Sequence, residues 1–308
     1  MAKILTVFGA TGNQGGSVVR AVLEHPILSK SYKIRAVTRD PTKPNAKALS
    51  DKGAEVVKAD LSDKASVVQA VKGSHAVFGV TNFWENPPSK QREYTQGKHI
   101  ADASKETGVE HLIWSTLPHA STLTGGKLSG VTHFDSKAEV AEYIEQQGIP
   151  ATFYLPACFM SNITGSLQKT GAGYSLNYPF TPTTVIPCID VVADTGKFVA
   201  AALANPSAFI GKKILGVTGW YTPNDIKAAF EEATGKQLEY NEISVETFRS
   251  FLPDFMAEEL GENFLLIKDY QYYGPGTEKK IGESLKVLQE VGESPTGLKE
   301  FFSQAKLP

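Results

Sequence analysis

The sequence predicts an α/β protein built on a doubly wound parallel sheet, with a smaller α/β lobe interleaved toward the C-terminal end. Three observations lead to this prediction. Strand-like apolar segments alternate with helical segments through the first half of the chain. A glycine-rich turn joins the first strand to the first helix. From residue 156 onward the alternation ends, and Pro, Gly, Thr and Tyr become more frequent. Strands that alternate with helices of about 10 to 15 residues are typical of parallel sheets covered on both faces.

Short runs of apolar and β-branched residues predict the strands of this sheet. Such runs, bounded by turn residues, are typical of strands that are buried on both faces. They cover residues 4–8, 33–38, 54–59, 75–80, 111–115 and 151–155.

Helical patterns occupy the segments between these strands. Three of these helices are predicted to end at a glycine, which readily adopts the positive φ that ends many helices. These glycines are Gly73, Gly108 and Gly148. The helices are predicted over residues 17–24, 44–52, 64–72, 90–107 and 135–147, with a loop over residues 118–130.

The C-terminal part is predicted as a smaller lobe that binds a substrate or a partner. Loops and short strands are expected from residue 156. A helix over residues 189–203 and a strand over residues 213–217 are expected to rejoin the main sheet, so that the segment 188–218 returns to the first domain. The remainder is expected to be mostly helical. We therefore predict a first domain over residues 1–155 and a lobe over residues 156–308.

Composition narrows the range of functions. Of the 308 residues, 41% are hydrophobic and 21% are charged, which is typical of a soluble globular protein. A net charge of −2 argues against a broad surface for nucleic acid, and no apolar run approaches the length of a membrane span. A strand begins at once, which leaves no room for a signal peptide. Cys158 and Cys188 cannot form a metal cluster by themselves and are expected as buried thiols. The expected location is the cytoplasm, with the nucleus as a second compartment.

The turn Gly-Ala-Thr-Gly-Asn-Gln-Gly-Gly at residues 9–16 carries the clearest chemistry. Its glycines allow a sharp turn and a close approach of the backbone to a pyrophosphate, and the helix that follows presents free N–H groups to the phosphates. A strand, such a turn and a helix in this order predict a dinucleotide site of the Rossmann type. The spacing Gly-x-x-Gly-x-x-Gly is that of extended and atypical short-chain reductases. The candidate residues are Gly9, Ala10, Thr11, Gly12, Asn13, Gln14 and Gly15.

The end of the second strand indicates which nucleotide is bound. NAD-selective folds place an acidic residue there, whereas this chain has Thr38 followed by Arg39. A guanidinium suits a 2′-phosphate, and Lys43 adds a second positive charge. Asp40 could instead reach a ribose, and the two cations could be solvated loop residues. We favour NADP(H) over NAD(H).

The end of the third strand carries Asp60 and Leu61, which fit the usual contact to the adenine edge. The alternative is that Asp60 belongs to the start of the following helix, beside Ser62 and Asp63.

The usual catalytic pair of short-chain reductases is incomplete in this chain. That pair is a Tyr followed four residues later by a Lys, but the expected helix reads His133-Phe134-Asp135-Ser136-Lys137. The lysine is present and the tyrosine is not. The pair Tyr94 and Lys98 precedes the fifth strand and is interpreted as a coincidence. At the end of that strand, Ser115-Thr116 occupies the usual serine position.

Two roles remain open for the residues that stand where the pair is expected. Either Lys137 anchors the nicotinamide ribose and transfers no proton, or Lys137 or His133 is the acid–base group. Histidine is chemically competent near neutral pH, and a lysine can act as a base when burial lowers its pKa. We favour ribose anchoring for Lys137 and leave the role of His133 open.

Four motifs together resemble the NmrA-like family of atypical short-chain reductases, and within it the NADPH-sensor branch. They are the glycine turn, Val37-Thr38-Arg39, the stretch Val80-Thr81-Asn82-Phe83-Trp84-Glu85 and His133-Phe134-Asp135-Ser136-Lys137. The likeness covers the first domain, extends through residues 159–162 and is looser over about the last 90 residues. It implies these NADP(H)-binding residues: Gly9 to Gln14, Arg39, Lys43, Asp60, Leu61, Thr81, Asn82, Phe83, Lys137, Phe159, Met160, Ser161 and Asn162.

The resemblance implies a sensor of cofactor redox state that reports to a regulatory protein partner. The alternative is an NADPH-dependent reductase of a small carbonyl or enone that uses Lys137 or His133. Phe83 and Trp84 could line a pocket over the nicotinamide or pack as ordinary loop aromatics on the lobe. A DNA-binding repressor is disfavoured, because the chain has no basic stripe. The substrate, the partner and the oligomeric state are left open.

Overall fold

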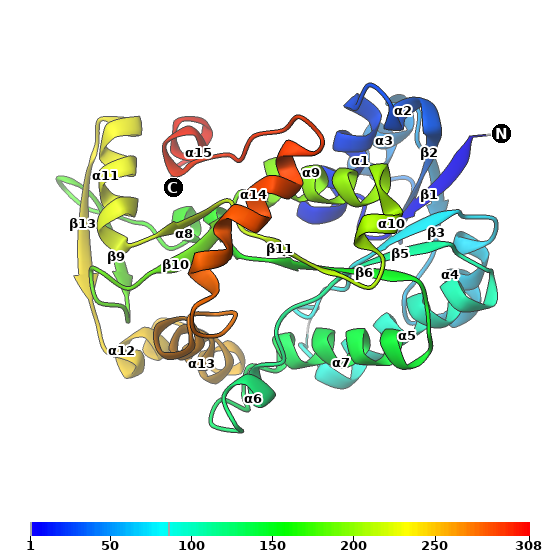
Figure 1. The fold of residues 1–308 in the computed structure, drawn as a ribbon. Helices are drawn as coiled ribbons and strands as arrows, with labels where there is room; N and C mark the ends of the chain where they lie inside the picture. Colours follow the sequence, from blue (N-terminus) through cyan, green and yellow to red (C-terminus); the bar gives the residue numbers. More distant parts are fainter. Residues whose placement is uncertain (1, 86) are drawn as a thin grey trace.

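The larger half of the molecule is organised around a seven-stranded sheet in which every pair of neighbours is parallel (Figure 1). The computed structural model describes residues 2–85 and 87–308. The strand order is β11-β6-β5-β4-β1-β2-β3. The chain therefore starts in the middle at β1 and winds outward in both directions, as in doubly wound dinucleotide-binding folds. The predicted fold class is confirmed. The strands are β1 (Lys3–Val7), β2 (Tyr32–Thr38), β3 (Glu55–Lys58), β4 (Ala76–Gly79), β5 (His111–Ser115), β6 (Ala151–Pro156) and β11 (Lys213–Gly216).

Helices cover both faces of this sheet. One face carries α1 and α9, which pack against each other, and the opposite face carries α4, α5 and α7 (Figure 1). Each set shares an apolar core with the strands beneath it. The helices of this half are α1 (Asn13–Glu24), α2 (Leu28–Ser31), α3 (Pro44–Asp51), α4 (Lys64–Val71), α5 (Lys90–Glu106), α6 (Ala120–Leu123), α7 (Thr132–Gln146), α9 (Val191–Ala204) and α10 (Pro206–Phe209).

Two helices begin earlier than the sequence pattern predicts. Helix α1 begins at Asn13 instead of residue 17, and α7 begins at Thr132 instead of residue 135. The first turn of α1 contains Gly15 and Gly16, whose low helix propensity conceals the start of the helix. The loop expected over residues 118–130 also contains the short helix α6.

The C-terminal lobe contains two small sheets, ordered β12-β10-β7 and β13-β9-β8. The remainder after residue 218 is mostly helical, as expected, but it also contains β12 and β13, which pair with strands from earlier in the lobe. Such pairing is non-local, so no local pattern reveals it. The strands are β7 (Cys158–Phe159), β8 (Gln168–Lys169), β9 (Gly173–Tyr178), β10 (Ile186–Ile189), β12 (Gly219–Tyr221) and β13 (Gln237–Glu242).

The helices of the lobe pack around an aromatic core. Tyr178 and Phe264 contact each other there, and each also contacts Phe180 and Phe248; the rings of Phe180 and Phe264 are stacked at 4.9 Å. These helices are α8 (Met160–Gly165), α11 (Pro223–Thr234), α12 (Val245–Ser250), α13 (Asp254–Tyr270) and α15 (Leu298–Gln304). Between α13 and α15 the chain forms η1 (Thr277–Lys280) and α14 (Ile281–Gln289), and α14 packs instead on α9 and β11 of the main sheet.

The chain passes between the two halves more than once. After β6 it enters the lobe, and it returns through α9 and β11, which pack on α1 and pair with β6. It then builds the rest of the lobe, including α13, which lies near α6 and α7 (Figure 1). None of the helices in the described part of the chain combines the length and the apolar character that crossing a bilayer requires.

Candidate functional site

The glycine turn forms a tight cradle at the carboxyl end of β1. Gly9 has a φ of +61° and accepts a hydrogen bond of 2.8 Å from the Gly12 N–H. A Cβ at Gly15 would lie 2.3 Å from the Gly9 carbonyl oxygen, so only glycine allows this approach of helix to turn. Ala10 is buried beneath the turn, while Thr11 and Asn13 are exposed on it.

The start of α1 is free to bind an anion. Its N-cap residue, Gly12, has no side chain to cap the helix, and the first turn carries no acidic residue. The first N–H groups of a helix have no partner within the helix, and with the helix dipole they favour negative charge. The cradle and this helix start therefore fit the pyrophosphate of a dinucleotide.

The end of β2 places an exposed cation beside a carboxylate that is already engaged. Arg39 is exposed, and its guanidinium contacts the Glu85 carboxylate at 2.6 Å. Asp40, the competing ribose ligand, is occupied by Thr42, which donates its hydroxyl at 2.6 Å and its N–H at 2.9 Å. These hydrogen bonds hold the pKa of the Asp40 carboxyl below its usual range. Lys43 is exposed just before α3.

Asp60 and Leu61 follow β3 at the same edge of the sheet. The Asp60 carboxylate accepts the Ser62 N–H at 2.8 Å, and the Leu61 carbonyl lies 2.7 Å from His99 Nδ1. The N-cap of α4 is Asp63, so Asp60 is not the helix-capping residue. The exposed side chain of Asp60 thus lies beside the sheet edge where a dinucleotide would extend.

Lys137 is held by a buried carboxylate that the sequence analysis did not identify. Its ammonium pairs with Glu93, in the first turn of α5, and the Glu93 side chain is 1% exposed. The same carboxylate accepts the hydroxyl of Thr81 at 2.8 Å and that of Ser136. A buried carboxylate with three donors fixes the position of Lys137 rather than leaving it mobile. Helix α5 is mostly polar, so nothing in its sequence indicated that Glu93 would be buried.

His133 is held by a second carboxylate, which comes from the lobe. Its Nδ1 lies 2.7 Å from Glu259 on α13, and its backbone N–H donates to the same oxygen. Because an ionised carboxylate only accepts hydrogen bonds, Nδ1 carries the proton and Nε2 is left for another partner. Glu262, one turn further along, accepts the Gly130 N–H at 2.7 Å. Nothing in the sequence connects residues 259 and 262 with residue 133.

Phe83 and Trp84 surround His133. The His133 ring centroid lies 5.8 Å from that of Phe83 and 5.3 Å from that of Trp84. Both aromatic residues also line the cavity described next, so they are more than loop aromatics packed on the lobe.

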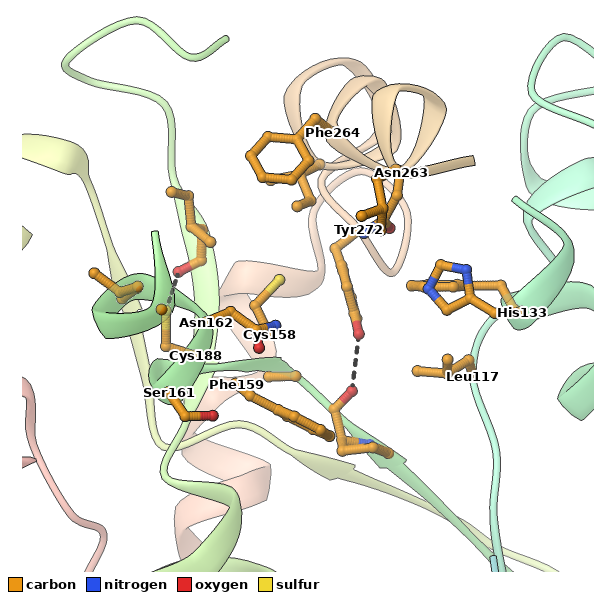
Figure 2. A pocket seen from close by; sticks show the side chains of 18 of the residues that line it. Leu117, His133, Cys158, Phe159, Ser161, Asn162, Cys188, Asn263, Phe264 and Tyr272 are labelled. Atoms are coloured by element: carbon orange, nitrogen blue, oxygen red, sulfur yellow. Dashed lines mark hydrogen bonds between the residues drawn. The ribbon is translucent and has the colours of Figure 1, made fainter. Parts of the chain in front are cut away.

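A cavity of about 640 Å³ opens beside Lys137 and His133 and extends into the lobe (Figure 2). From the larger half it is lined by predicted residues: Gln14, Thr81, Asn82, Phe83, His133 and Lys137. Ser115 also lines it and donates to Gln14 Oε1 at 2.7 Å. From the lobe, the predicted residues that line it are Phe159, Ser161 and Asn162.

Other predicted residues do not line this cavity. Met160 is fully buried in the core of the lobe. Arg39, Lys43, Asp60 and Leu61 lie at the ends of β2 and β3, where they would meet the other end of a dinucleotide. The pair Tyr94 and Lys98 also lies outside the lining, in agreement with its interpretation as a coincidence.

The deep part of the cavity is built mainly from apolar residues of the lobe that sequence reasoning did not identify. They include Ile226, Met256, Leu260, Phe264 and Ile267. These residues are typical of any packed core, so their sequence pattern does not distinguish a cavity wall. Together they make a chamber suited to an apolar molecule.

Neither cysteine nor tyrosine offers a replacement for the missing catalytic tyrosine. Cys158 and Cys188 occupy paired positions of β7 and β10, and burial raises the pKa of Cys158 to about 12 and that of Cys188 well above its usual value. The Tyr272 hydroxyl donates to the Pro156 carbonyl at 3.1 Å (Figure 2), and burial raises its pKa as well. His133 is therefore the titratable group best placed for proton transfer at this cavity.

A family model described as the NmrA-like family matches residues 1–302. The oxidoreductase malD of Malbranchea aurantiaca, an NmrA-like family domain-containing protein, is 32% identical over 254 residues, covering 77% of this chain and 75% of its own. The NmrA-like family domain-containing protein DDB_G0286605 of Dictyostelium discoideum is 30% identical over 309 residues, covering 95% and 97%.

Solved structures share the fold. NmrA, a negative transcriptional regulator, in complex with NADP superposes with a TM-score of 0.79 at 21% identity, covering 98% of this chain and 95% of its own. The triphenylmethane reductase of Citrobacter sp. complexed with NADP(H) superposes with a TM-score of 0.75 at 20% identity, covering 99% and 100%. At these identities the likeness concerns the fold alone.

Proposed function

This chain belongs to the NmrA-like family, and we propose that it is an NADP(H)-dependent oxidoreductase that reduces a carbonyl or enone of a bulky, largely apolar molecule. The observation that carries this proposal is the cavity of about 640 Å³ beside Lys137 and His133. Its volume lies within the range typical of small-molecule sites, and its walls are mainly apolar. Several relatives, malD among them, carry the name oxidoreductase. The cavity therefore favours the reductase over the sensor.

NADP(H) is the cofactor that the site accommodates best. The uncapped start of α1 would bind the pyrophosphate and Arg39 the 2′-phosphate. Lys137, fixed by Glu93, would anchor the nicotinamide ribose. The NADP complexes of NmrA and of the triphenylmethane reductase, which share the fold, support this assignment. When bound in its reduced form, the nicotinamide supplies a hydride.

His133 is the proposed proton donor. As the substrate carbon accepts the hydride, the carbonyl oxygen would take a proton from Nε2 of the protonated His133 ring. The Glu259 carboxylate holds Nδ1–H and balances the positive charge of that ring before the transfer. Water would then return a proton to Nε2. Lys137 is less suited to this role, because its ammonium is committed to Glu93.

Steady-state oxidation of NADPH tests the proposal. The purified protein would be assayed against ketones and enones of increasing apolar size, from butenone to tricyclic compounds. We expect turnover to rise with apolar size, since larger molecules fill the cavity. Binding of NADPH without its oxidation by any member of the panel would contradict the proposal.

A second candidate function is the redox sensor, and the ion pair of Arg39 with Glu85 favours it. A 2′-phosphate at Arg39 would compete with the Glu85 carboxylate. Glu85 follows Phe83 and Trp84, which pack on His133 and so approach α13 of the lobe. Occupancy of the cofactor site could thereby alter a surface that a regulatory protein contacts.

Hydrogen exchange can test this second candidate. A sensor requires NADPH and NADP⁺ to protect residues 81–85 and 254–262 to different extents, because only a difference between the two redox forms can be reported. Equal protection by both forms would count against it.

A further inference from the structure

We propose that Lys58 is a specificity-determining residue that contacts the 2′-phosphate of NADP(H), together with Arg39 and Lys43. No motif in the sequence pointed to Lys58. This inference rests on the cofactor of the proposed function and not on its reaction, because it concerns binding alone.

Lys58 is the last residue of β3, at the edge of the sheet where β2 also ends. It pairs in register with Thr38, the residue that precedes Arg39. Paired residues of neighbouring strands carry their side chains on the same face of a sheet, and the strands lie about 4.8 Å apart. The carboxyl ends of parallel strands form the ligand edge of such folds. The ammonium of Lys58, which is exposed, can therefore reach the end of β2.

The surroundings of Asp40 show that Lys43 and Lys58 lie near the same point. Hydrogen bonds from Thr42 lower the pKa of the Asp40 carboxyl, and the positive charges of Lys43 and Lys58 lower it further. The two ammonium groups thus act on one carboxylate from different elements, the start of α3 and the end of β3. Since Asp40 follows Arg39 directly, all three cations lie around the end of β2.

The carboxylates near the ends of β2 and β3 have partners of their own. They are Asp40 with Thr42, Asp60 with the Ser62 N–H, and Glu85 with Arg39. Within residues 2–85 and 87–308, no carboxylate forms an ion pair with Lys43 or Lys58. A phosphate monoester carries a charge of about −1.5 to −2 near pH 7. It would supply the counter-charge that both lysines lack.

The part of the chain around this point is positively charged. Over residues 1–75, which form β1 to β3 and α1 to α4, Lys and Arg outnumber Asp and Glu two to one. The whole chain nevertheless has a net charge of −2. A group with two negative charges is therefore attracted to this end of the molecule in particular.

Nucleotide binding by the cofactor-free protein tests this inference. NADP⁺ and NAD⁺ differ only in the 2′-phosphate, so the ratio of their dissociation constants measures the contribution of that group. Isothermal titration calorimetry would measure both constants in the wild type and in Lys58→Gln. We expect the substitution to weaken NADP⁺ binding about tenfold and to change NAD⁺ binding by less than about twofold, because a charge-assisted hydrogen bond to the phosphate is lost.

Two further variants separate a direct contact from other effects. Lys58→Arg retains a charged donor at the same position and should keep most of the preference for NADP⁺. Lys33→Gln removes another exposed lysine, which lies on β2 about 16 Å before Thr38. It should leave the preference unchanged. Both lysines are exposed, so these substitutions do not disturb the core.

Three results would overturn the inference: an unchanged preference in Lys58→Gln, equal weakening of both nucleotides in that variant, or a loss of preference that Lys33→Gln reproduces. A wild type without any preference for NADP⁺ would overturn the role of Arg39 as well as that of Lys58. Absence of NADPH oxidation would overturn only the proposed reaction, so the two failures are distinguishable.

Discussion

We propose that nucleotide selection depends on Arg39. Its guanidinium is exposed and is contacted by Glu85 at 2.6 Å, whereas Asp40 is engaged by Thr42. Replacement Arg39→Ala should weaken NADP(H) binding about tenfold to a hundredfold and leave NAD(H) binding nearly unchanged, because only NADP(H) carries the 2′-phosphate. Calorimetry with both nucleotides measures the difference. The matched variant Glu85→Gln removes a competitor and should strengthen NADP(H) binding. Equal losses for both nucleotides in Arg39→Ala would refute the assignment.

Glu93 is the residue that holds Lys137 in place. Replacement Glu93→Gln leaves a buried ammonium without its counter-charge and should lower the free energy of unfolding by about 3 kcal/mol. Urea denaturation measures this. The control is Glu106→Gln, which breaks the exposed ion pair of Glu106 with Lys64. This substitution should lower the free energy of unfolding by less than about 1 kcal/mol. Equal losses of unfolding free energy for the two substitutions would contradict a buried ion pair between Glu93 and Lys137.

His111 makes stability depend on pH. Burial, and then the charge of nearby His75, lowers its pKa from 6.5 to about 4. The unfolded chain therefore protonates His111 more readily than the folded protein does. The stability that neutral His111 contributes is complete above pH 6.5 and is lost as the pH falls toward 4. The loss amounts to about 3 kcal/mol. Urea denaturation between these pH values should show that the free energy of unfolding declines less steeply with falling pH in His111→Gln than in the wild type. Identical slopes would contradict this.

At the scale of elements, α13 connects the lobe to the start of α7. Glu259 and Glu262 accept hydrogen bonds from His133 and Gly130, so one helix of the lobe fixes the residue proposed to transfer the proton. Among the described residues of the first domain, no carboxylate does this for His133. The arrangement makes Glu259 a positioning residue that acts through His133.

Replacement Glu259→Gln should therefore change the chemistry more than the fold. An amide can donate to the ring as well as accept from it, so the tautomer with the proton on Nδ1 is no longer fixed. We expect ring-nitrogen NMR to change from one tautomer to a mixture, and kcat to fall about tenfold to a hundredfold. Glu262→Gln, on the same helix, is the matched control and should alter neither. An unchanged tautomer in Glu259→Gln would remove this role from Glu259.

The elements that sequence alone could predict are those with a local pattern. The strands of the main sheet are runs of apolar residues, and their positions agree with the structure to within one or two residues. The start of α1 was concealed by Gly15 and Gly16, which are present for close approach and not for helix formation. Strands β12 and β13 depend on pairing with distant strands, and such pairing leaves no local trace.

At the scale of the whole molecule, the site is assembled from two halves that the chain visits in turn. The glycine turn, Thr81 and Lys137 could be predicted because their motifs are contiguous and follow recognisable strands. Glu93 and Glu259 could not be, because each acquires its role only when distant helices meet. The cavity itself depends on how α13 is placed over the sheet edge, and that placement is a property of packing rather than of any sequence pattern.

The central claim is that this cavity holds a substrate and that His133 protonates it. The most direct measurement is steady-state NADPH oxidation with a bulky apolar ketone or enone, compared between the wild type and His133→Asn. We predict turnover in the wild type and a kcat lower by about a hundredfold or more in the variant, with NADPH binding unchanged. Equal turnover in the two proteins, or binding of NADPH without oxidation by any compound of the panel, would contradict the account.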